Sequence, residues 1–287
     1  MDTYNKVLAC VDHSRFADFV TDYATWAATR LNAPMELLHI IDRQEAPTAS
    51  EDHSGTIGFD AQEQLLDKLS SEDEVRTRAA REAGRALLTR LRNRASDSGA
   101  PHVDIRQRYG ELEETLREQQ QGVGLIVLGR RGQAAETTQR DLGRNVERVV
   151  RALNHPILTV TEDYQPPQQV MFAFDGSAVT RRGVDLLANS ALCRSLPILL
   201  LMSGKAGQDE RKKLDRAAKR LTDAGLIVNA ELIPGDAETV IARTAQERNI
   251  DLLIMGAFGH SHLRSLLFGS KTADLLRSSK IPTLLLR

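Results

Sequence analysis

The fold of this chain is decided by residues 251–287, which read DLLIMGAFGHSHLRSLLFGSKTADLLRSSKIPTLLLR. The run Asp251-Leu-Leu-Ile-Met255 is short, apolar and followed by glycine, which is typical of a strand buried on both faces of a parallel sheet. Gly256 and Gly259 come next, and Gly269-Ser270 opens a segment with helical periodicity. A second apolar run, 281–286, predicts the last strand.

A strand, a glycine-rich turn and a helix N-terminus together favour an anion-binding site. Glycines let the backbone approach a ligand closely, and the free N–H groups and dipole of the first helical turn attract negative charge. Ser270 is placed as the N-cap of that helix. The phosphates of a nucleotide would fit there, although the same glycines could serve only turns and a helix start.

The spacing Gly-x2-Gly-x9-Gly-Ser, from Gly256 to Ser270, resembles the motif of the universal stress protein family. The resemblance implies a Rossmann-like fold of the adenine nucleotide alpha hydrolase type, with ATP held by backbone amides and the serine hydroxyl. It also implies that Asp175 lies near the adenosine, and Mg²⁺ could accompany the phosphates. The predicted nucleotide-binding residues are Asp175, Met255, Gly256, Gly259, Gly269, Ser270, Lys271 and Thr272.

Several of these residue types have plain structural alternatives. Asp175 could instead cap a helix or form a turn ahead of Arg181. Lys271 could add charge beside the phosphates or be a solvated surface lysine. His260 and His262 suggest a metal site, but two histidines in a polar loop without a third ligand indicate a solvated loop. We therefore expect no metal site and no catalytic residue.

The chain contains the same pattern twice. The first copy starts with a strand at 6–11 and Asp12-His13-Ser14, and the second starts with a strand at 170–174 and Asp175-Gly176-Ser177. Five strands alternating with four helices in each copy predict an α/β protein. Right-handed crossovers between parallel strands would give each copy a five-stranded parallel sheet with helices on both faces.

We expect two tandem domains, at 1–163 and 170–287, joined by a proline-bearing linker at 164–169. Only the first domain carries a polar, acidic insertion, at about 42–71. We predict that this insertion is a loop or lid, followed by a charged helix at 72–95.

The final strands of the two domains, Thr159–Thr161 and Thr283–Leu286, are expected at sheet edges. Exposed edges tend to pair. In the universal stress protein family these strands commonly form the dimer contact, so the resemblance implies that the two halves form a pseudo-dimer within one chain. A homodimer of whole chains could form as well.

The first copy departs from the binding motif. Gly129 and Gly132 repeat the first glycine gap, but Gly143 is followed by Arg144 instead of a serine. An arginine there removes the hydroxyl cap and places a cation where the helix dipole disfavours it, although it could still bind a phosphate. We therefore predict that the second domain binds the nucleotide and that the first is structural or regulatory.

Composition narrows the classes of partner. The chain has 287 residues, 41% of them apolar, and a net charge of -1, so it lacks the basic excess of a nucleic-acid or anionic-membrane binder. The N-terminus does not resemble a signal peptide, and no apolar run approaches the roughly 20 residues that span a bilayer. Cys10 and Cys193 suit buried positions in a reducing compartment, though either could be a redox sensor. We expect a cytoplasmic protein with a small-molecule partner.

The sequence contains no nucleophile–base pair, P-loop or kinase catalytic loop. Without a placed base, bound ATP would be hydrolysed slowly at best, so we predict an ATP-binding stress-response or signalling protein and not an enzyme. One alternative is an ATP-using enzyme, such as a nucleotidyl transferase, whose turnover would disappear in His260→Ala. Another is an interaction module that docks through the acidic insertion and shows no thermal shift with ATP.

Overall fold

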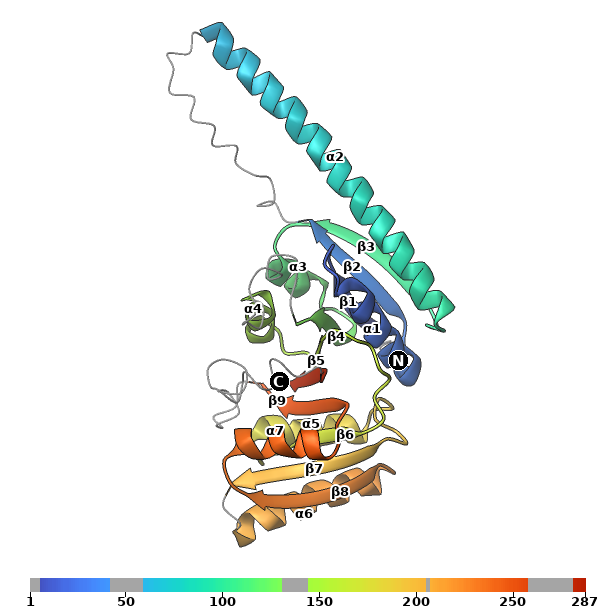
Figure 1. Cartoon of the computed structure of the whole chain (residues 1–287), viewed down its shortest axis with the longest axis vertical. Helices are drawn as coiled ribbons and strands as arrows, with labels where there is room; N and C mark the ends of the chain where they lie inside the picture. Colours follow the sequence, from blue (N-terminus) through green and yellow to red (C-terminus); the bar gives the residue numbers. More distant parts are fainter. Residues whose placement is uncertain (1–5, 42–58, 131–143, 205–206, 258–280) are drawn as a thin grey trace.

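The protein is described by a computed structural model over residues 6–41, 59–130, 144–204, 207–257 and 281–287 (Figure 1). Strands and helices alternate along both copies of the repeat. The strands are β1 Lys6–Val11, β2 Met35–Ile41, β3 Val103–Tyr109, β4 Val123–Gly129, β5 Ile157–Val160, β6 Val170–Ala173, β7 Pro197–Gly204, β8 Ile227–Pro234, β9 Leu252–Gly256 and β10 Thr283–Leu286. The helices are α1 Ala17–Leu31, α2 Phe59–Asp97, α3 Leu112–Gln119, α4 Arg144–Ala152, α5 Ala178–Ala188, α6 Gln208–Asp223 and α7 Ala237–Glu247.

The ten strands form one continuous sheet in the order β3-β2-β1-β4-β5-β10-β9-β6-β7-β8. The five strands of each half are parallel to one another, which confirms the predicted fold class. The halves meet through β5 and β10, which pair antiparallel with Leu158 opposite Leu284. Each final strand therefore covers the open edge of the other.

Helices cover both faces of the sheet, and each face has its own apolar core. One core lies beneath α1, α2, α5 and α6, and the other lies beneath α3, α4 and α7. Because the inner strands are buried on both faces, they are apolar at consecutive positions and do not alternate. Leu8 and Ala9 of β1, for example, are both fully buried although they point to opposite faces.

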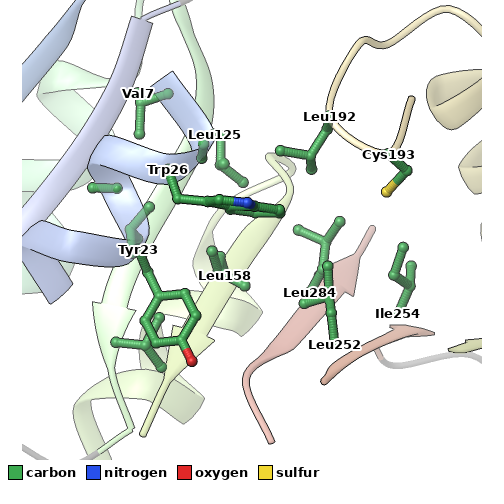
Figure 2. Packing of buried hydrophobic residues seen from close by; sticks show 14 of the residues in the cluster. Val7, Tyr23, Trp26, Leu125, Leu158, Leu192, Cys193, Leu252, Ile254 and Leu284 are labelled. Carbon is green, nitrogen blue, oxygen red and sulfur yellow. The ribbon is translucent and has the colours of Figure 1, made fainter. Parts of the chain in front are cut away.

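The first of these cores continues from one half into the other. Figure 2 shows Trp26 of α1 pointing into the space between Leu158 of β5 and Leu192, which follows α5. Leu284 of β10 belongs to the same cluster, and Trp26 is only 8% exposed. Burial of apolar surface contributes about 25 cal/mol per Å², so this shared core stabilises the joined halves as one body.

The linker after β5 is fixed to both halves. The backbone N–H groups of Gln168 and Gln169 donate to Asp251 Oδ2 at 3.0 and 2.9 Å. The rings of Tyr164 and Tyr23 meet edge to face with centroids 4.9 Å apart. Burial raises the pKa of both tyrosines, that of Tyr164 to about 12.

The expectation for the polar insertion was wrong over part of its length. Helix α2 begins at Phe59, well before the predicted start at residue 72, and runs for 39 residues. Leu65, Leu66 and Leu69 recur at helical spacing. Ser70 and Ser71 follow them, but good helix formers stand on both sides of the two serines, so the helix continues through them. Figure 1 shows α2 lying along β3 with its C-terminal part and projecting beyond the sheet with its N-terminal part. The rest of the insertion, residues 42–58, lies outside the described residues.

Candidate functional site

The predicted crevice of the second half lies at the carboxyl ends of β6 and β9. These strands are parallel neighbours, with Ala173 opposite Met255, so the chain leaves both at the same edge of the sheet. Asp175 follows β6, and Gly256 ends β9. The order of strands reverses between β6 and β9, and doubly wound sheets bind ligands at such a switch point. The structure thus brings Asp175, Met255 and Gly256 together.

The Asp175 carboxylate organises the start of α5. Its Oδ1 accepts hydrogen bonds from the N–H of Ser177 at 2.9 Å and from the hydroxyl of Thr180 at 2.7 Å. Ser177 is the N-cap, and Gly176 between the two has a φ of 72°, a left-handed conformation that glycine adopts without strain. The structural alternative, in which Asp175 forms a turn ahead of α5, is therefore realised.

Met255 and Gly256 are part of the packed end of β9. The Met255 side chain is 1% exposed and lies in the core beneath α7, so a ligand could reach only its backbone. A Cβ on Gly256 would lie 3.3 Å from Val179 Cγ1 and 3.3 Å from Thr180 Cγ2. Carbon atoms in contact are normally about 3.5–4.0 Å apart, so glycine here lets the first turn of α5 approach the strand end.

The other predicted binding residues lie outside the described residues. They are Gly259, Gly269, Ser270, Lys271 and Thr272. His260 and His262, which we expected to be ordinary loop residues, lie in the same undescribed range. The roles of all seven stay predictions.

In the first half β1 and β4 are likewise parallel neighbours, with Cys10 opposite Leu128, so their carboxyl ends lie side by side. Asp12 follows β1, and its Oδ1 accepts hydrogen bonds from the N–H of Ser14 at 3.0 Å and from the Ser14 hydroxyl. The opening turn is thus shared by both halves. Helix α4, which ends the binding motif in this half, begins at Arg144.

Arg130 is a residue that the sequence analysis missed. It follows β4 and is only 8% exposed, and its Nη2 donates to the Ile281 carbonyl at 2.8 Å and to Thr283 Oγ1 at 3.1 Å. An arginine of the first half therefore holds the last strand of the second half. The available signal was an arginine directly after a buried strand, where the second copy has Ala257.

Two histidines lie at the same end of the sheet in the first half. The rings of His13 and His39 are edge to face, with centroids 5.1 Å apart, and Gln107 Nε2 lies 3.4 Å from His39 Nδ1. His39 is 4% exposed, and its burial lowers its pKa, as does the neighbouring His13. A Cβ on Gly84 of α2 would lie 2.7 Å from His39 Nδ1, so α2 closes directly over this ring. His39 is therefore a neutral, buried side chain at neutral pH.

The two cysteines lie in buried surroundings that keep their thiols protonated. Burial raises the pKa of both cysteines, that of Cys193 to about 12, so neither is a thiolate near neutral pH. Within the described ranges, no three histidine, cysteine, aspartate or glutamate side chains could share a metal ion. No described helix combines the length and hydropathy needed to cross a bilayer.

The fold defines a tandem α/β protein made of two Rossmann-like halves, each with a polar turn at its switch point. The sequence model of the universal stress protein family matches residues 3–161 and 196–287. The chain therefore belongs to the universal stress protein family.

Relatives and solved structures agree with this assignment. The chain is 34% identical over 285 residues to the universal stress protein Slr1230 of Synechocystis, covering 98% of this chain and 99% of that one. It is 27% identical over 86 residues to the universal stress protein MJ0577 of Methanocaldococcus jannaschii, covering 30% and 53%. A solved universal stress protein from Archaeoglobus fulgidus aligns with a TM-score of 0.67 and 17% identity over 98% of each chain, which shows a shared fold.

Proposed function

We propose that this tandem universal stress protein binds ATP in the crevice of its second half and acts as a stress-response or signalling protein. The observation that carries the proposal is the position of Asp175 and Gly256 at adjoining strand ends, on the ligand-binding edge of the sheet. Family membership supports it, because some members bind adenine nucleotides: one universal stress protein has been solved in complex with cAMP.

In this proposal different groups of the chain contact different parts of the nucleotide. Asp175 accepts hydrogen bonds from the adenosine through its carboxylate oxygens. The glycine-rich segment from Gly256 to Ser270 presents backbone amides to the phosphates, and Lys271 adds a positive charge. Mg²⁺ would bind through the phosphates.

The first half is proposed to be structural or regulatory. Its Arg130 is engaged with Ile281 and Thr283 in the other half, and its α4 begins with Arg144, not with a hydroxyl residue. A cation at a helix start opposes the dipole that would otherwise attract phosphate. The two halves therefore have the same turn after their first strand, but the first half carries arginines where the second half has Ala257 and Ser270.

Isothermal titration calorimetry with ATP tests the proposal, because the repeat provides a matched control. Asp175→Asn keeps an oxygen that can accept from Ser177 but removes the negative charge, so ATP affinity should fall about tenfold, the loss of one charge-assisted hydrogen bond. Asp12→Asn makes the same change in the first half and should leave affinity unchanged. Equal losses in the two variants would contradict the asymmetry, and no heat of binding with the wild-type protein would contradict nucleotide binding itself.

A further inference from the structure

A hollow lies between the two halves, near the amino ends of β4 and β7. We call it the inter-half pocket, and its volume is about 700 Å³. The first half contributes the segment between α1 and β2 and the start of β4, and the second contributes the end of α5 and the segment before β7. Pockets of roughly 300–1,000 Å³ have the size that holds small organic ligands. Because both halves line it, the pocket depends on their being joined.

Leucines form the apolar wall of the inter-half pocket. Leu31 and Leu125 come from the first half, and Leu186 and Leu284 come from the second. Leu186 is 37% exposed, which is unusual among the apolar residues of α5. Figure 2 shows Leu125 and Leu284 in the shared core near Trp26. The apolar wall is therefore continuous with the packing that joins the halves.

One corner of the inter-half pocket is polar and positively charged. Arg194 is the one charged residue among the described residues that line it. Its side chain is exposed, and its guanidinium makes no hydrogen bond or ion pair with another described residue. Asn32, Asn189 and Ser190 line the same pocket and supply further hydrogen-bonding groups. No carboxylate among the described lining residues offsets the charge of Arg194.

Arg30 of α1 fixes this corner in place. Its guanidinium donates to the carbonyl oxygens of Leu192 and Arg194 and lies over the ring of Trp26, 5.8 Å from the centroid. The first half thus holds the backbone of the segment that carries Arg194. A side chain on a fixed segment can bind a ligand with less loss of conformational freedom.

We propose that the inter-half pocket binds a small amphipathic monocarboxylate, with its carboxylate on Arg194 and its apolar chain against the leucines. A guanidinium binds a carboxylate through two parallel hydrogen bonds. The leucine wall beside this charge suits a ligand that joins one carboxylate to an apolar chain. Such a ligand would touch Arg194 of the second half and Leu31 and Leu125 of the first, so it would bridge the two halves.

Octanoate is a suitable probe for the full-length protein, with 1-octanol as its uncharged counterpart. Calorimetry should show one octanoate per chain, and the emission of Trp26, the single tryptophan of the sequence, should change in parallel. Arg194→Gln should weaken octanoate about tenfold or more, because it removes a charge-assisted contact. Arg182→Gln is the matched control, since Arg182 is an exposed arginine of α5 that does not line the pocket.

The apolar wall has its own test. Leu186→Ser alters a partly exposed residue, so the fold is retained, and it should weaken octanoate and 1-octanol alike. In the wild-type protein 1-octanol should bind more weakly than octanoate, and Arg194→Gln should not change its affinity. The proposal is overturned by a lack of saturable octanoate binding, by equal octanoate affinity in wild type and Arg194→Gln, or by 1-octanol binding as tightly as octanoate.

Discussion

Gly183 of α5 provides a sharp test of how the helices pack on the joined sheet. A Cβ at this position would lie 2.2 Å from Leu286 Cδ1 and 3.1 Å from Phe172 Cζ, whereas carbon atoms in contact are about 3.5–4.0 Å apart. Leu286 and Phe172 are 2% and 0% exposed and lie in the packed core, so their side chains have little room to move away. Overpacking costs about 1–3 kcal/mol, while alanine improves helix propensity by about 1 kcal/mol. Gly183→Ala should therefore lower the free energy of unfolding by up to about 2 kcal/mol.

Urea unfolding followed by circular dichroism measures this loss, and Leu286→Ala provides the internal control. That change removes the Cδ1 that the new methyl group would meet. In the Leu286→Ala background, Gly183→Ala should become neutral or stabilising by up to about 1 kcal/mol, because the gain in helix propensity is no longer opposed. The packing argument is refuted if Gly183→Ala stabilises the wild-type chain, or if it destabilises both backgrounds equally.

Two further predictions concern Arg130 and His39. Arg130→Met removes two hydrogen bonds between the halves and should lower the free energy of unfolding by about 2 kcal/mol. Arg148→Met, which breaks surface ion pairs with Glu111 and Glu113, should lower it by about 1 kcal/mol or less. Equal losses in thermal unfolding would contradict the role given to Arg130. In the folded protein the pKa of His39 lies below its unfolded value of about 6.5, so the unfolded chain binds more protons as pH falls through this range. The free energy of unfolding due to neutral His39 is therefore lost as pH falls below about 6.5. His39→Gln should therefore flatten the fall of the urea midpoint between about pH 7.5 and pH 5.5, and an unchanged slope would count against this assignment.

The strands could be predicted closely from the sequence. The first was expected at 6–11 and lies at Lys6–Val11, and the strand expected at 251–255 lies at Leu252–Gly256. Strands buried on both faces are apolar at every position, so hydrophobicity alone marks their limits. The resemblance to the universal stress protein family implied that Asp175 and Gly256 belong to one site, and the pairing of β6 with β9 brings the two residues to neighbouring strand ends.

The features that were missed depend on contacts far along the chain or on weak local patterns. Arg130 finds its carbonyl partner 151 residues later, and nothing near it in the sequence points to Ile281. The start of α2 was missed because the segment after Phe59 carries few apolar residues and two adjacent serines, a pattern that favours a loop when tertiary packing is unknown.

Native mass spectrometry of the full-length protein incubated with ATP tests the central claim most directly, because it counts the nucleotides on each chain. We predict one ATP per chain for the wild-type protein and for Gly143→Ala in the first half, and none for the double variant Gly269→Ala, Ser270→Ala in the second half. Two nucleotides on the wild-type chain, or a single nucleotide that survives the second-half changes and is lost with Gly143→Ala, would contradict a binding site in the second half alone.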